Sequence, residues 1–88
     1  MHINCAIPGS RSLKEKRRAM NSLKSRLRAR YNCSVAEVDW KDQWNRARLA
    51  VSVVSDNSTH VDEQLSEIAR FASTHHLVEV LEITQEHV

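Results

Sequence analysis

The residues with the clearest chemical potential are basic, and they are concentrated in one segment. Nine of the thirteen Lys and Arg side chains lie between Arg11 and Arg30, with Glu15 the single acid among them. On a helix of 3.6 residues per turn, five of these bases fall within about 120° of one another: Lys14, Arg17, Arg18, Lys24 and Arg28. Arg26 and Arg30 fall on the opposite flank. Such a stripe predicts binding to a phosphate backbone, because each phosphate that is neutralised releases a counterion.

The alternative is a solvated basic face that is partly paired within the chain. Glu63 and Glu67, on a second predicted helix, are the nearest acids in the pattern, and two acids cannot balance nine bases. Residues 1–50 carry twelve basic and four acidic side chains, whereas residues 51–88 carry one basic and seven acidic. The halves are therefore about +8 and −6, which favours a polyanionic partner, internal pairing or both.

The start of the basic segment is a second candidate site. Gly9, Ser10, Arg11 and Ser12 precede backbone N–H groups at a helix start, and such groups attract anions. Ser12 and Glu15 fit an S-x-x-E capping box, which already uses two of those donors. A single Gly and no G-K-[ST] exclude a nucleotide phosphate loop. We expect Arg11 to supply one contact within a larger nucleic-acid footprint.

Two tryptophans lie at the polar tip formed by residues 41–46, one just before it and one within it. Trp40 is expected to cap the core at the end of a hairpin. Trp44 lies at the tip with Arg46 and Arg48 nearby, so it is a candidate to stack on a base. The alternative for Trp44 is packing over the apolar edge of its own hairpin.

The remaining reactive residue types show no catalytic pattern. No spacing brings the histidines together with acids or cysteines: His60, His75, His76 and His87. Cys5 and Cys33 are too few for a disulfide framework and are expected to be free thiols. We therefore predict a non-enzymatic protein with no cofactor and no metal. With no apolar run near 18 residues and no signal peptide, we expect a cytoplasmic protein without a membrane span.

Hydrophobic periodicity predicts the elements that position these residues. The predicted order is a strand at 2–7, a helix ending near Tyr31 with Asn32 as a left-handed stop, strands at 33–40 and 47–54, a helix at 58–74, a strand at 77–83 and a tail at 85–88. This β-α-β-β-α-β order predicts one ferredoxin-like α+β domain, a split β-α-β fold. Its four-stranded antiparallel sheet has the strand order 4-1-3-2, with both helices on one face.

The apolar side of the first helix would pack on the sheet with Leu13, Met20, Leu23, Leu27 and Tyr31. Alternation places nine residues on the opposite, open face: Asn4, Ala6, Val35, Glu37, Asp39, Arg48, Ala50, Ser52 and Val54. RNA-recognition motifs carry aromatic residues on this face, and none is expected here. The helical side is therefore the predicted RNA surface, and the open face is a candidate for a protein contact or self-association.

Three stretches carry a family resemblance: PGSRSLKEKRR from Pro8, the stretch NCSVAEVDWKDQWNRARLAVSVVS from Asn32, and the final acidic strand. With these the chain resembles the YlxP-like family of small bacterial proteins of uncharacterised function. The resemblance implies a ferredoxin-like fold. The family's genes commonly lie beside those of translation initiation factor two and ribosome-binding factor A, which implies a ribosome or RNA role by association.

Together these patterns predict an accessory protein that binds structured RNA, in the ribosome or its precursor. The predicted contact residues are Arg11, Lys14, Arg17, Arg18, Lys24, Arg28 and Trp44. The alternative is a protein-interaction module that forms a homodimer or docks a partner through the open sheet face. An enzyme acting on a small anionic substrate is the least favoured class.

Overall fold

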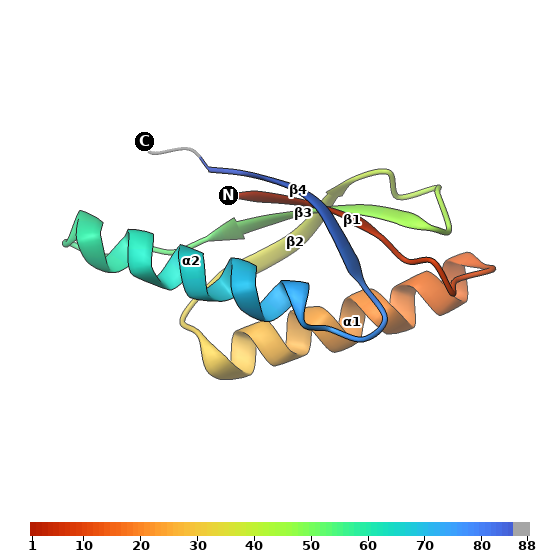
Figure 1. Cartoon of the computed structure of the whole chain (residues 1–88), viewed down its shortest axis with the longest axis horizontal. Coiled ribbons are helices and arrows are strands. Elements are labelled where there is room, and N and C mark those ends of the chain that lie inside the picture. The colour runs from red at the N-terminus through yellow and green to blue at the C-terminus, as the bar shows by residue number, and fades with distance from the viewer. Residues whose placement is uncertain (86–88) are drawn as a thin grey trace.

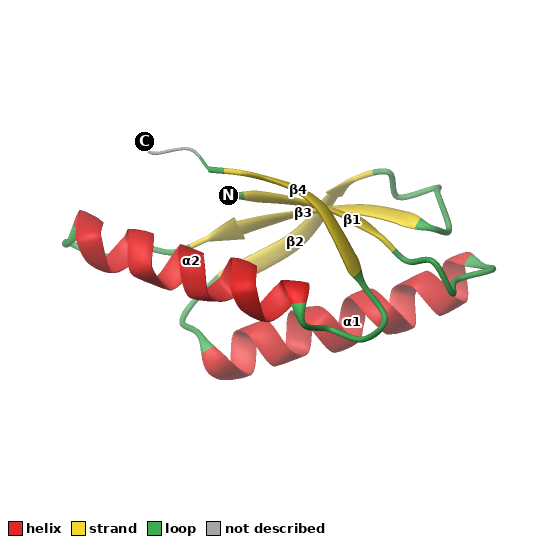
Figure 2. Ribbon diagram, in the orientation of Figure 1, coloured by secondary structure: helices red, strands yellow, loops and turns green. Residues whose placement is uncertain are grey.

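Two helices cover one face of a four-stranded antiparallel sheet in the computed structural model, which describes residues 1–85 (Figures 1 and 2). The elements are β1 (His2–Ala6), α1 (Leu13–Arg30), β2 (Ser34–Asp39), β3 (Arg46–Ser52), α2 (Ser58–Ser73) and β4 (Glu79–Thr84). The sheet order is β2-β3-β1-β4, which is the predicted order read from the other edge. The predicted ferredoxin-like α+β fold is confirmed.

Local side-chain bonds fix the start of α1. The Ser12 hydroxyl accepts the Glu15 N–H at 3.1 Å, as the predicted capping box requires. The Glu15 carboxylate accepts the N–H of Arg11, one residue before the N-cap, so the second bond of the box is displaced by one residue. At the other end, Tyr31 is the C-cap in an extended conformation with φ −129°. The predicted left-handed Asn32 is wrong, because Trp40 is the one non-glycine residue with positive φ in residues 1–85.

The core lies between the sheet and the helices. β1 and β3 bury alternate residues as predicted, including Ile3, Cys5 and Leu49. The centre of the apolar stripe of α1 is fully buried at Met20, Leu23 and Leu27. The ends of this stripe, at Leu13 and Tyr31, are half-buried. α2 contributes three buried residues: Leu65, Ile68 and Ala72. The apolar periodicity therefore placed most of the core correctly.

β2 faces the opposite way from the prediction over most of its length. Val35 is buried against the core and Glu37 lies on the same side, whereas Ala36 is exposed on the open face. The pairing with β3 shifts between Glu37 and Asp39, which leaves Val38 as an extra residue. Asp39 therefore returns to the open face. The alternation rule failed because a bulge changes which residues share a face.

Three smaller predictions concern Val54, the two cysteines and the C-terminal tail. Val54 lies beyond the end of β3 and is 88% exposed, so it is not part of the open sheet face. Cys5 and Cys33 are both free, as predicted, because β3 separates their strands. The predicted tail at 85–88 falls mostly on residues 86–88, which lie outside the described residues. In the described part of the chain, no helix is long and apolar enough to cross a membrane.

Candidate functional site

The basic stripe of α1 lies on the side of the helix turned away from the sheet. Four of its five members are exposed and Lys24 is half-buried. Among residues 1–85, Glu63 and Glu67 form no ion pair with any base of α1. The alternative of partial pairing with α2 is therefore not observed among residues 1–85, and the stripe has no acidic partner there.

Arg28 is the member of the stripe with a second role. Its Nη2 donates a hydrogen bond of 2.7 Å to the carbonyl oxygen of Val35 in β2. The guanidinium thus ties the last turns of α1 to an edge strand while its side chain remains exposed overall. The other exposed members of the stripe, Lys14, Arg17 and Arg18, lie in the first two turns of the helix.

Arg26 and Arg30 lie on the opposite flank, as predicted, and that flank faces α2. The Arg30 guanidinium stacks 4.7 Å from the centre of the Phe71 ring, a cation–π contact. Arg26 lies close enough to His75 to help lower the pKa of that imidazole. These two bases therefore belong to the contact between the helices.

Lys16 is a buried base that the sequence pattern did not separate from the exposed bases of α1. It is 1% exposed, and its ammonium forms an ion pair of 2.8 Å with Glu37. The same ammonium donates to three backbone carbonyls, those of Trp40 at 2.9 Å, Lys41 at 3.3 Å and Arg46 at 3.1 Å. The signal was present in the spacing, because Lys16 precedes Met20, Leu23 and Leu27 at steps of four, three and four. A base that continues the spacing of an apolar stripe lies on the buried side of the helix.

The Lys16 bonds fix the tip of the β2–β3 hairpin beside the first turns of α1. Trp40 has a left-handed backbone with φ 58°, which is unfavourable for a residue of this size. Its carbonyl is held by Lys16, and its half-buried ring lies 5.9 Å from the Arg46 guanidinium. Trp40 is not among the side chains that form the core cluster or pack against it in the described chain, so the prediction that it caps the core is wrong. Trp44 is 48% exposed at the tip, where a base could reach its ring.

The start of α1 is less available to an anion than its sequence suggests. The Arg11 N–H and the Glu15 N–H are taken by the capping box, and the Ser10 hydroxyl donates to the Ser12 carbonyl at 3.0 Å. A cavity of about 390 Å³ opens beside this turn, with Arg18 and Glu15 both in its lining. The Arg11 side chain is exposed at this turn and forms no ion pair among residues 1–85.

His75 joins α1 to the turn between α2 and β4. Its Nδ1 accepts the Leu77 N–H at 3.2 Å, so the proton of the neutral ring is on Nε2, which lies 3.2 Å from the Ser22 hydroxyl. The ring also stacks on His76, with ring centres 5.1 Å apart. Burial lowers the pKa of His75, and the positive charge of Arg26 and the neighbouring His76 lower it further.

This arrangement predicts an acid-dependent loss of stability. Above the ordinary pKa of 6.5 the ring is neutral in both states, and below it the unfolded chain takes up a proton that the native chain resists. The free energy of unfolding should therefore fall as the pH drops below 6.5. Urea denaturation at pH 7.5 and pH 5.0 should show a smaller difference for His75→Gln than for the wild type. His60→Gln, an exposed change on α2, is the control and should keep the wild-type difference.

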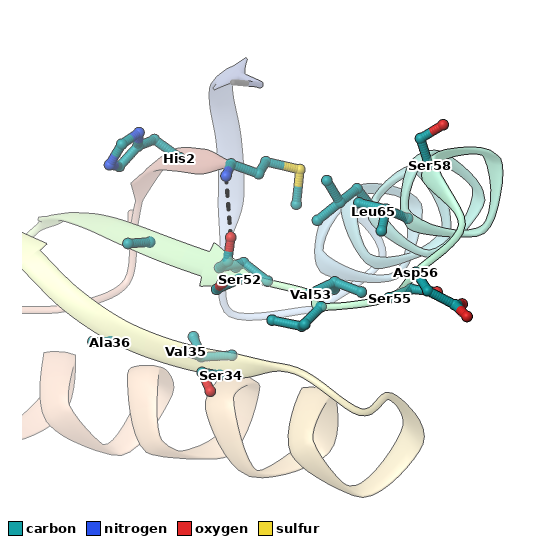
Figure 3. Close-up of a pocket in the computed structure, with 15 residues that line it drawn as sticks. His2, Ser34, Val35, Ala36, Ser52, Val53, Ser55, Asp56, Ser58 and Leu65 are labelled. Carbon is teal, nitrogen blue, oxygen red and sulfur yellow. Dashed lines mark hydrogen bonds between the residues drawn. The ribbon is translucent and has the colours of Figure 1, made fainter. Parts of the chain in front are cut away.

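A separate groove lies where the ends of β2 and β3 approach the first half of α2 (Figure 3). Its volume is about 760 Å³, and aliphatic side chains of all three elements line it, among them Val35, Val51 and Leu65. Among the described residues, Asp56 is the one carboxylate in the lining.

Within residues 1–85, no three His, Cys, Asp or Glu side chains are grouped to hold a metal ion. Burial raises the pKa of the Cys5 thiol to about 11, which keeps it protonated at neutral pH.

The fold and the site define a ferredoxin-like α+β protein whose most distinctive feature is a charged helix face. The chain belongs to the family described as "Protein of unknown function (DUF503)", which matches residues 1–85. It is similar to "Uncharacterized protein YlxP" of Bacillus subtilis (strain 168), with 28% identity over 67 residues. That match covers 76% of this chain and 73% of the Bacillus protein. The resemblance seen in the sequence to a YlxP-like family is confirmed.

Proposed function

We propose that this protein is a non-enzymatic accessory factor of the cytoplasm that binds structured RNA, in the ribosome or its precursor, through the outer face of α1. The observation that carries the proposal is the exposed stripe of Lys14, Arg17, Arg18, Lys24 and Arg28, which has no acidic partner in the described residues. Among residues 1–85, Arg28 is the one member of this stripe that bonds to the sheet. Positive charge that the fold does not neutralise is available to phosphates.

The dimensions of the stripe suit a polynucleotide. From Lys14 to Arg28 the helix rises about 21 Å at 1.5 Å per residue, which is long enough to contact several phosphates. Trp44 lies in the hairpin tip whose carbonyls at Lys41 and Arg46 bond Lys16, and its exposed ring adds an aromatic surface for an unstacked base. Structured RNA offers both duplex phosphates and unpaired bases, whereas duplex DNA offers no unstacked base. This combination favours structured RNA as the partner class.

The salt dependence of binding tests the proposal. Affinity for an RNA hairpin with an unpaired loop should fall steeply with salt, with a log–log slope of about −0.7 to −0.9 for each phosphate contacted. Four or five contacts therefore give a slope of about −3 to −4.5. In the same way, the protein should co-sediment with ribosomal subunits at low salt and leave them at high salt. Absence of RNA binding, or binding that does not change with salt, would refute the proposal.

A further inference from the structure

We propose that a second copy of this chain covers the open face of the sheet. The twofold axis of the dimer runs along β1 and pairs the basic residues of β3 in each copy with the acidic residues of β4 in the other. This proposal does not rest on RNA binding, since it concerns the face of the sheet opposite the helices (Figure 1). It rests on the order of charges on that face and on one polar side chain at its centre.

The strand register places the charges in an ordered pattern. Two rows of paired residues cross the open face from β3 through β1 to β4: Arg46–Ala6–Glu79 and Arg48–Asn4–Glu82. From β3 to β4, each row therefore has a base at one end, a small residue in the middle and an acid at the other end. Asp39 of β2 lies beside Arg48 on the same face and forms no ion pair with it in the described chain. The four charged residues form no ion pair with one another in the described chain. Their strands are about 10 Å apart with β1 between them, so pairing within one copy is hindered.

The charges select one way of packing two such faces. If the twofold axis ran across the strands at the Asn4 row, Arg48 would meet Arg48 and Glu82 would meet Glu82 of the other copy. If the axis runs along β1, Arg48 of each copy lies over Glu82 of the other, and Arg46 lies over Glu79. Opposite charges then meet in both rows and on both sides of the axis. Electrostatic complementarity of this kind sets the orientation of a contact more than its affinity.

Asn4 supplies an independent observation at the axis. Its side-chain oxygen is buried and has no hydrogen-bond donor in the described structure. With the axis along β1, Asn4 of each copy faces Asn4 of the other. Stacked sheets lie about 10 Å apart, a spacing at which two extended Asn side chains reach each other. Because this oxygen is buried within the single chain, the amide must first turn about its terminal side-chain bond to present it. Each amide N–H can then donate to the other amide oxygen, which gives the unpaired acceptor its donor.

The contact is small, so the dimer is reversible. Three strands of each copy overlap in this arrangement, because β2 extends past the edge of the partner sheet. Three strands about 4.8 Å apart and five residues long cover on the order of 250 Å² of each sheet in plan. Contacts of this size belong to the weak class of specific interfaces. Dilution should therefore shift the equilibrium toward the monomer.

A charge-swap series followed by sedimentation velocity tests the dimer. Arg48→Glu and Glu82→Arg should each weaken dimerisation at least about tenfold, because each places like charges together at two symmetric positions. The double variant R48E/E82R restores opposite charges and should recover most of the wild-type dissociation constant. Unchanged helical circular dichroism would show that each variant is folded.

The matched control makes the same two substitution types at exposed positions of α2. Arg70→Glu and Glu67→Arg, singly and together, should leave the dissociation constant unchanged. A wild-type protein that stays monomeric at the highest soluble concentration would overturn the proposal. A dimer that the single changes at Arg48 and Glu82 do not weaken, or that the double variant does not recover, would also overturn it.

Discussion

Replacing Lys14, Arg17 and Arg18 with Glu is expected to abolish binding to structured RNA while leaving the protein folded. All three side chains are exposed in the first two turns of α1, so their removal leaves no cavity and no unpaired buried group. Exposed substitutions usually change the free energy of unfolding by no more than about 0.5 kcal/mol each. Three lost phosphate contacts should lower affinity at least about 100-fold at low salt and reduce the magnitude of the salt slope by about 2 to 3.

The matched control reverses the charge of three other bases. Two of them, Arg26 and Arg30, lie on the flank of α1 that faces α2, and the third, Arg70, lies on α2. Arg26→Glu, Arg30→Glu and Arg70→Glu change the net charge by the same amount, so any general electrostatic effect on RNA is equal in the two variants. Because Arg30 stacks on Phe71, this control also loses a cation–π contact and should be slightly less stable. Filter binding should nevertheless show the larger loss for the α1 stripe. Equal losses in the two variants would mean that net charge, and not the stripe, determines the affinity.

Replacing Lys16 with Met is expected to destabilise the protein by about 3 kcal/mol, because removing one partner of a buried ion pair leaves the other uncompensated. Met fills the space of the Lys side chain, but it leaves the Glu37 carboxylate and the carbonyls of Lys41 and Arg46 without the Lys16 donor. The Trp40 carbonyl keeps the N–H of Gln43. Glu37 keeps 16% of its side chain exposed, so solvent should limit the cost to the lower part of the range for buried pairs. Urea denaturation monitored by circular dichroism measures the change.

Two further variants separate the ion pair from simple loss of a base. Lys14→Met removes an exposed base two residues away on the same helix and should change stability by no more than about 0.5 kcal/mol. Lys16→Met combined with Glu37→Leu removes both charges and should recover part of the loss, since a buried pair replaced by apolar residues is often tolerated. If Lys16→Met were as stable as Lys14→Met, the bonds of Lys16 would not hold the hairpin.

The sequence predicted the parts of the fold that depend on local rules. The capping box at Ser12 and Glu15 lies within one turn, and the alternation of β1 and β3 is uninterrupted, so both were placed correctly. β2 was assigned to the wrong face because a bulge at Val38 changes the alternation after Glu37. Glu37, on the same side of β2 as Val35, pairs with Lys16, which is 21 residues away in the chain. Local periodicity contains no information about such a contact.

In the candidate site, too, local geometry predicted one part, and the other part depends on the tertiary structure. Helical geometry alone predicted that the stripe with Arg17 and Arg18 would face solvent, because the apolar residues fix the side of α1 that is buried. It did not distinguish Lys16 from the other bases of a crowded segment. It also did not predict the bond from Arg28 to Val35, which requires β2 to lie at the edge of the sheet beside α1. Residue type predicted the charge, and only the tertiary structure showed which charges remain free.

The Arg28 bond has a consequence for association along the sheet edge. Both backbone groups of Val51 are bonded to Met1, on the β1 side, so the groups of its partner Val35 point away from β3 toward the free edge of the sheet. Unpaired groups on an edge strand are a template for strands of other molecules. Arg28 occupies one of these acceptors, and the bulge at Val38 interrupts the edge a few residues later. A guanidinium can hold this carbonyl and still offer its other N–H groups outward, so the same arginine protects the sheet from strand-by-strand aggregation.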